Sequence, residues 1–262
     1  MELLSTYTRE SCWNGRIVRV AKPGKINDGT QTTVIDANGE YLAPGFLDAH
    51  IHVESSMVTG MEFAREAIKA GTTGIFHDPH EIANVLGLEG VYILQEEFEH
   101  TPLKTFFTVP SCVPTAPGLE DSGTNLNAKD IADALERDDA MGLGEMMDFP
   151  GIINGEAFAH DRLAVAQRSG EVATGHFASR ERDGSLDAYA AAGISSCHES
   201  IGRDGALARL RDGMWAMLRQ GTSWQNVPET VETITTTDVD PRHLLLVTDD
   251  VNAKTMVKSG HL

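Results

Sequence analysis

The strongest constraint on the fold is a pair of histidines, His50 and His52, at the end of the apolar segment 41–53. In an extended strand successive side chains alternate between two faces, so residues i and i+2 point to the same side. Two imidazoles placed in this way can hold one metal ion between them. An isolated pair of this kind is more often a chance pair of strand histidines, so the interpretation depends on further ligands elsewhere in the chain.

The rest of the chain alternates between short apolar segments and amphipathic helical stretches from residue 44 onward. This alternation is typical of a parallel sheet covered by helices, and eight repeats predict an α/β protein with a closed (β/α)8 barrel of the TIM type. We expect strands at residues 45–53, 72–78, 105–111, 141–147, 172–177, 194–199, 214–219 and 243–249. We expect helices at residues 60–70, 81–99, 128–136, 156–169, 204–212 and 224–235. The seventh strand is the weakest of these, because residues 207–218 could form one continuous helix.

Candidate metal ligands lie where these predicted strands end, which is where barrels of this type place their active sites. They are His50 and His52 on the first strand, Glu145 on the fourth, His176 on the fifth, His198 on the sixth and Asp249 on the eighth. Imidazoles with one or two carboxylates suit Zn²⁺, Mn²⁺ or Fe²⁺, and such an ion lowers the pKa of a bound water. The alternative is a salt-bridged or capping acid at Glu145, and satisfied core histidines at His176 and His198.

Residues 1–43 form a separate, smaller prediction. Strand-like segments at 15–20 and 33–36 and the turn Asn38-Gly39 indicate two or three small strands. We therefore expect a partial β domain at 1–43 and a hydrolase barrel at 44–262, shortened at its last helix.

Composition excludes several classes of protein. A net charge of −18 makes nucleic acid and anionic membrane surfaces poor partners, and it is typical either of a salt-rich cytosol or of an ordinary acidic surface. No apolar run approaches the roughly 20 residues of a membrane span, and the first residues lack a signal peptide, so we expect a cytoplasmic location. Cys12, Cys112 and Cys197 lack C-x-x-C spacing, which argues against a disulfide framework or a thiolate zinc site.

Longer motifs narrow the interpretation. They are PGFLDAHIHVESSM at 44–57, DPHEIANV at 78–85, PSCVP at 110–114, GLGEMM at 142–147, GISSCHE at 193–199 and TDD at 248–250. On these motifs the chain resembles the amidohydrolase superfamily and, within it, the adenine deaminase family. Members of that family are longer, so the resemblance implies a partial chain that lacks a C-terminal region.

The resemblance implies a site with two divalent ions, Mn, Fe or Zn. His50, His52 and Asp249 would hold one ion, His176 and His198 would hold the other, and Glu145 would bridge them. Many relatives bridge with a carbamylated lysine, whereas the fourth strand here offers Glu145 and no lysine.

The implied reaction is the hydrolytic deamination of adenine to hypoxanthine and ammonia, as in purine salvage. Asp249 would accept a proton from the attacking hydroxide, and Glu81 would protonate the ring; the alternative for Glu81 is a carboxylate that stabilises a helix N-terminus. His80 and Glu54 are candidates for orienting substrate or ligands, and Asp250 for capping a helix or supporting a ligand.

Other functions stay open at this point. The chain could be a different amidohydrolase, such as a cyclic amidase or a deacetylase, or a metal-binding chain without turnover. The expected partner is a small purine, and the protein is expected either to form a homo-oligomer or to need the C-terminal region.

Overall fold

The computed structural model describes residues 9–22, 24–27, 29–179, 184–199 and 202–262. Contacts divide the chain into two compact units, one up to Pro44 and one from Gly45 onward. Among the described residues, no helix is long and apolar enough to cross a membrane.

The first unit contains a β-hairpin. Strands β1 (Arg9–Trp13) and β2 (Arg16–Ala21) pair in antiparallel fashion. They are joined by Asn14 and Gly15, whose φ angles of 48° and 71° are those of a tight hairpin turn. The strand expected at 33–36 is wrong. The β1–β2 pairing is the only one in the described part of this unit, and a strand forms only where a neighbour accepts its backbone hydrogen bonds.

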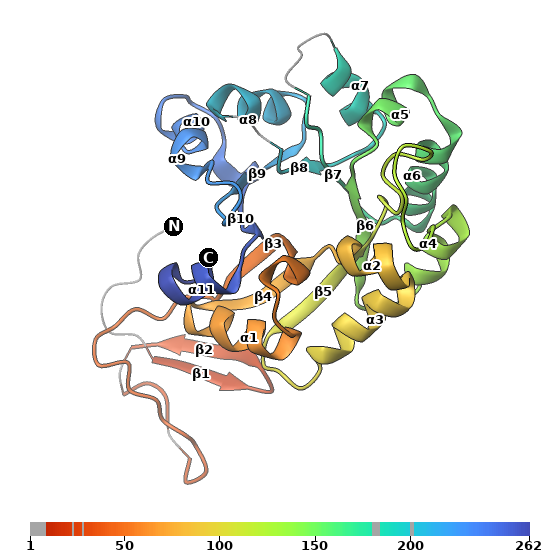
Figure 1. Cartoon of the computed structure of the whole chain (residues 1–262). Coiled ribbons are helices and arrows are strands. Elements are labelled where there is room, and N and C mark those ends of the chain that lie inside the picture. The colour runs from red at the N-terminus through yellow and green to blue at the C-terminus, as the bar shows by residue number, and fades with distance from the viewer. Residues whose placement is uncertain (1–8, 23, 28, 180–183, 200–201) are drawn as a thin grey trace. The chain divides into compact units, whose positions relative to one another are not determined.

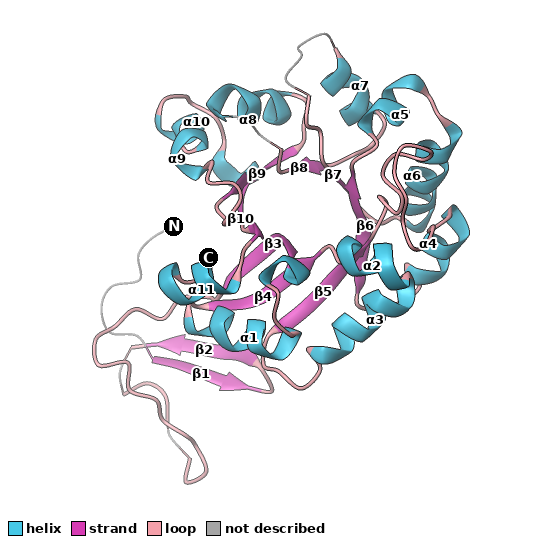
Figure 2. Cartoon of the chain, in the orientation of Figure 1, coloured by secondary structure: helices cyan, strands magenta, loops and turns pink. Residues whose placement is uncertain are grey.

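The second unit is a ring of parallel strands with helices outside it (Figure 2). All eight strands expected from the sequence are confirmed, and the eighth is divided into β10 and β11 at Thr248. The strands are β3 (Phe46–His52), β4 (Thr72–His77), β5 (Lys104–Val109), β6 (Ala140–Met146), β7 (Ala173–Gly175), β8 (Ser196–Cys197), β9 (Trp215–Arg219), β10 (Leu244–Val247) and β11 (Asp249–Asp250).

Two contacts close the ring. Strands β3 to β7 form one parallel run and β8 to β10 another, and the Ser195 N–H donates to the Ala173 carbonyl at 2.9 Å between β7 and β8. At the other seam β11 pairs with β3, with Asp249 opposite Ile51. The predicted (β/α)8 barrel is therefore confirmed.

The helices surround the barrel in chain order (Figure 1). They are α1 (Gly60–Lys69), α2 (His80–Leu86), α3 (Leu88–Glu97), α4 (Ala128–Ala134), α5 (Phe149–Asn154), α6 (Ala157–Ser169), α7 (Ser185–Ala191), α8 (Gly202–Arg211), α9 (Val227–Thr230), α10 (Glu232–Thr235) and α11 (Ala253–Ser259), with 3₁₀ turns η1 (Val53–Ser56) and η2 (Pro241–His243). The single helix expected at 81–99 is broken at Gly87, whose φ of 65° lies outside helical geometry. The helix expected at 224–235 forms only the short α9 and α10.

The core lies between the strands and the helices. One cluster gathers Phe107, Leu143 and Tyr189, and another gathers Ile51 and Phe63, all without measurable exposure. Burying one such side chain contributes about 1.5–3 kcal/mol. This packing holds the strands in register, so their carboxyl ends meet at one rim of the barrel.

Candidate metal centre

The six side chains expected as ligands lie together at this rim, in three overlapping groups. Within each group the ligand atoms lie within 4.8 Å of one another. The groups are His50, His52 and Glu145; His50, His198 and Asp249; and Glu145, His176 and His198. A fourth group, Asp78, His80 and Glu145, adjoins them.

The two histidines of β3 present free ring nitrogens to the cluster. His52 donates through Nδ1 to the Asp78 carbonyl at 2.8 Å, which directs Nε2 toward Glu145 Oε1 at 3.4 Å and Asp249 Oδ1 at 3.3 Å. His50 Nε2 is buried and has no hydrogen-bond partner among the described residues. A backbone carbonyl that fixes one ring nitrogen and leaves the other free is the usual arrangement behind a metal-ligating histidine. The donor set therefore fits a divalent ion.

Glu145 lies at the middle of the cluster. Its Oε2 is 2.7 Å from His176 Nδ1 and 3.0 Å from His198 Nε2, while its Oε1 faces His52. Its backbone is held on both sides, since its N–H donates to Asp78 Oδ2 at 2.7 Å and its carbonyl accepts from Ser111 Oγ at 2.7 Å. The carboxylate is thus fixed between the two histidine pairs.

The surroundings strongly shift the pKa values of the side chains in the cluster. Burial alone would raise the pKa of Glu145, but His198 and the hydrogen bonds from His176 and His198 hold that pKa well below its usual range. Burial, together with His198 and His52, lowers the pKa of His50 to about 3. Against the opposing effect of burial, Asp249 and Glu145 raise the pKa of His52 to about 10, and Glu145 raises the pKa of His176. Because a metal ligates neutral imidazole, binding of an ion must displace protons from these two histidines.

Asp249 adopts an unusual backbone conformation, with a φ of 59° in the left-handed region. Its Oδ1 faces His52, whereas its Oδ2 accepts a hydrogen bond from Arg219 Nη1 at 2.6 Å. The same Arg219 nitrogen donates to Glu199 Oε1 at 2.7 Å. Left-handed residues other than glycine are costly and gather at functional sites, where surrounding contacts hold them.

Sequence reasoning missed Arg219 and Glu199, although a signal for each was present. Arg219 ends the seventh strand, where the rule that barrel sites gather at strand ends applies equally. Glu199 directly follows His198. Both side chains are buried, and a cation between two carboxylates is the arrangement that burial of such groups demands.

The remaining candidates lie around the cluster. His80 Nδ1 is 3.3 Å from Glu145 Oε1. Glu81 lies in the first turn of α2 and its side chain is exposed. Partial desolvation of its carboxyl group nevertheless raises its pKa, while the charges of His52 and His80 act to lower it.

Of the two roles expected for Asp250, helix capping is wrong, because Asn252 caps α11 by accepting from the Thr255 N–H at 2.9 Å. Support of a ligand by Asp250 stays a prediction.

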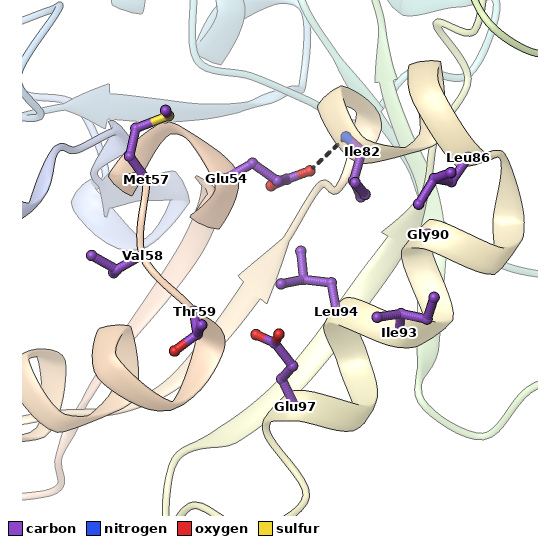
Figure 3. A pocket seen from close by; sticks show the side chains of 10 residues that line it. All are labelled: Glu54, Met57, Val58, Thr59, Ile82, Leu86, Gly90, Ile93, Leu94 and Glu97. Carbon is purple, nitrogen blue, oxygen red and sulfur yellow. Dashed lines mark hydrogen bonds between the residues drawn. The ribbon is translucent and has the colours of Figure 1, made fainter.

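Glu54 faces a separate cavity of about 420 Å³ between η1, α2 and α3 (Figure 3). Its Oε1 accepts from the Ile82 N–H at 3.2 Å, and burial raises its pKa to about 7. The lining is mostly aliphatic and includes Met57, Leu94 and Glu97 but none of the six cluster residues. Glu54 therefore supports the start of α2 from outside the metal cluster.

Comparisons with known proteins agree with this geometry. The amidohydrolase family model matches residues 41–260. A Moorella thermoacetica protein named adenine deaminase is 49% identical over 249 residues, covering 95% of this chain and 42% of that protein. Relatives with the same name from Clostridium botulinum and Rubrobacter xylanophilus are 44% and 45% identical, covering 99% and 94% of this chain but 44% and 41% of their own lengths.

The chain thus spans less than half the length of the curated relatives that it matches. Among solved structures, a 5-methylcytosine deaminase from Klebsiella pneumoniae liganded with 5-fluorocytosine superposes with a TM-score of 0.57 at 12% identity, covering 93% of this chain and 72% of that one. At that identity the likeness concerns the fold alone. With the family model matched across the barrel and its strand-end ligands, the chain belongs to the amidohydrolase family.

Proposed function

We propose that this chain carries the catalytic centre of a hydrolase that converts adenine to hypoxanthine and ammonia. The observation that supports this most directly is the buried cluster of four histidines with Glu145 and Asp249, in a chain 44–49% identical to proteins named adenine deaminase. Because those relatives are longer, the activity of the whole protein is part of the proposal.

In this proposal the cluster holds two divalent ions of the Mn, Fe or Zn type. His50, His52 and Asp249 would hold one ion, His176 and His198 would hold the other, and Glu145 would contribute its carboxylate to both. Bound there, such ions lower the pKa of water and supply a nucleophile near neutral pH. The fixed Glu145 and the unpartnered His50 Nε2 support the assignment.

Two carboxylates of the chain would move protons. Asp249 Oδ1 takes the proton of the attacking water while Arg219 holds Oδ2, so the accepting oxygen keeps its place. Glu81, whose pKa is raised, donates a proton to the ring nitrogen as the water attacks. Asp249 then passes the proton it took from the water to the exocyclic amine, and the hydroxyl proton of the intermediate returns to Glu81 as ammonia leaves.

A direct assay tests the proposed reaction. The metal-loaded protein is incubated with adenine while hypoxanthine and ammonia are measured, with cytosine, a cyclic amide and an acetylated amino sugar as competing substrates. Release of both products from adenine is expected. A fully metal-loaded protein that releases neither, or prefers a competing substrate, would overturn the proposal in favour of another amidohydrolase or a chain without turnover.

Glu81→Gln tests the proton donor. Loss of a general acid lowers kcat by about 10²- to 10⁴-fold. Metal content should stay at the wild-type level, because Glu81 is an exposed residue of α2 and is not one of the proposed ligands. Glu89→Gln, on the neighbouring helix α3, is the matched control. Near-normal kcat in Glu81→Gln would leave Glu81 as a carboxylate that merely stabilises the start of α2.

The proposal also covers the location of the enzyme, its assembly and its response to salt. We propose a cytoplasmic enzyme that works as a homo-oligomer or together with a C-terminal region. The net charge of −18 supports adaptation to a salt-rich cytosol. A melting temperature that keeps rising above about 0.2 M salt, where surface charge is already well screened, supports that adaptation.

A further inference from the structure

The loop that follows β9, residues 220–226, carries a tryptophan at the rim where the cluster lies. Trp224 is 51% exposed, and the guanidinium carbon of Arg219 lies 4.9 Å from the centre of its ring. Arg219 in turn bonds Asp249 Oδ2 at 2.6 Å. The ring therefore lies one residue away from a candidate metal ligand.

The loop is held in place by backbone hydrogen bonds to two strands. The Asn226 N–H donates to the Arg219 carbonyl at 2.9 Å, and the Gly221 N–H donates to the Trp224 carbonyl at 2.8 Å. The Thr222 N–H donates to the Asp250 carbonyl of β11 at 2.7 Å. A rim loop fixed in this way can position a side chain for binding without first becoming ordered.

Two residues that bracket this loop, Arg219 and Asn226, each carry a buried polar atom that lacks a hydrogen-bond partner in the described part of the chain. Arg219 Nε is a donor and Asn226 Oδ1 is an acceptor, and neither makes a hydrogen bond. Buried polar atoms are ordinarily satisfied, so this open donor and this open acceptor, on residues joined by a backbone hydrogen bond, are places where a polar ligand or an ordered water can bind.

Trp224 lies at a different end of the barrel from the other exposed aromatic rings of this unit. Phe46 and Trp215 are also exposed, at 58% and 38%. They begin β3 and β9, however, and so lie at the amino end of the barrel, away from the cluster. Among the described residues of the barrel unit, Trp224 is the large exposed aromatic at the carboxyl end of the strands.

We propose that Trp224 forms one wall of the substrate site and stacks on the planar base that is deaminated. This inference rests on the proposed function, because it names the residue that selects a flat heteroaromatic ring. Stacking on an aromatic side chain favours binding of a flat base and tolerates any base, because every base has a π-face. Selection of one base over another falls to polar atoms such as Arg219 Nε and Asn226 Oδ1.

Three variants test the stacking role. Trp224→Leu should raise KM for adenine by about 10- to 100-fold while kcat changes far less, since the lost contact is made equally in ground and transition states. Trp224→Phe keeps an aromatic face and should recover most of that loss. Trp215→Leu, at the opposite end of the same strand, should leave both constants unchanged. An unchanged KM in Trp224→Leu, or an equal effect in Trp215→Leu, would contradict the proposal.

A binding measurement separates this inference from the proposed reaction. Hypoxanthine should quench tryptophan fluorescence in the wild type and in Trp215→Leu but not in Trp224→Leu. If the wild type binds hypoxanthine in this way yet releases no ammonia from adenine, the proposed reaction fails and the stacking residue stands. Absence of any quenching in the metal-loaded wild type overturns the inference. Loss of metal from Trp224→Leu also overturns it, because Trp224 would then act only by supporting Arg219.

Discussion

The two sides of the metal cluster are built by different means. We call His50, His52 and Asp249 the β3 side, and His176 and His198 the β7 side. Strand β3 has seven residues and pairs with β11, whereas β7 and β8 have three and two. The side chain of His50 is 3% exposed and that of His176 is 21% exposed.

The β3 side is tied together by one buried carboxylate. Asp48 accepts hydrogen bonds from the His50 N–H at 3.2 Å, the Thr248 N–H at 3.2 Å and Thr248 Oγ1 at 2.5 Å. Thr248 immediately precedes Asp249, so a single side chain aligns ligands that are about 200 residues apart in the sequence. Backbone pairing and this carboxylate together hold the β3 side.

The β7 side depends on a tyrosine instead. The Tyr189 hydroxyl accepts from the His176 N–H at 3.1 Å and donates to the Met146 carbonyl at 2.5 Å. The Phe177 N–H donates to Cys197 Sγ at 3.3 Å, which joins the ends of β7 and β8. These side-chain contacts supplement the backbone hydrogen bond between the Ser195 N–H and the Ala173 carbonyl. Because β7 and β8 are so short, the β7 side should adjust more readily and release its ion first.

The largest effect is expected where the two sides meet. Glu145→Gln removes the shared ligand, so metal content should fall from about two ions to below one per chain after extensive dialysis, and turnover should fall to background. Metal analysis measures the loss, with Glu136→Gln on the exposed surface as the control. Retention of both ions at full affinity would show that Glu145 does not bridge them.

An intermediate effect should distinguish the two sides. Asp48→Asn places a buried amide N–H group against the donors of His50 and Thr248. Tyr189→Phe leaves the His176 N–H without its acceptor. Each unsatisfied buried group lowers the free energy of unfolding by about 1–3 kcal/mol. Loss of such supporting hydrogen bonds lowers metal affinity by about 10- to 100-fold. We expect Asp48→Asn to weaken the more tightly held ion and Tyr189→Phe the other.

Stepwise metal titration by calorimetry reports the two affinities separately. Tyr92→Phe is a matched control, because Tyr92 packs against the same core cluster and contacts no ligand. If both variants weaken the same ion equally, the two sides are not independent and the comparison fails.

The smallest effect concerns pH and the β3 side. Burial lowers the pKa of His77 to about 4, and the next residue, Asp78, supplies the carbonyl that holds His52. In the unfolded chain the His77 imidazole takes up a proton near pH 6.5, whereas in the folded chain it stays neutral until about pH 4. The free energy of unfolding therefore falls as the pH drops from about 6.5 toward 4. His77→Gln should make this fall shallower in chelator, by about 2–4 °C in melting temperature for each kcal/mol of unfolding free energy that His77 no longer removes.

His100→Gln is the control for that measurement, since His100 is exposed and its substitution should not change the slope. Equal slopes in wild type and His77→Gln would mean that His77 takes up a proton in the folded state.

The local sequence pattern was enough to predict the strands of the barrel. The alternation of apolar segments and amphipathic stretches is a property of neighbouring residues, so the eight strands and the six cluster residues could be read directly. Residues 33–36 show where this fails. Their pattern is strand-like, but a strand also needs a partner at its edge, and local sequence does not say whether one exists.

Sequence alone determined which side chains can bind metal and that each ends a strand, because the strand period and the ligand chemistry are both local. Only the tertiary structure decided how these side chains meet. Asp48 on β3 binds Thr248 beside β11, and Tyr189 accepts from the His176 N–H. Arg219 donates to both Asp249 and Glu199. These contacts join residues brought together only by closure of the ring. Their energies depend on burial and direction, which no spacing along a chain encodes.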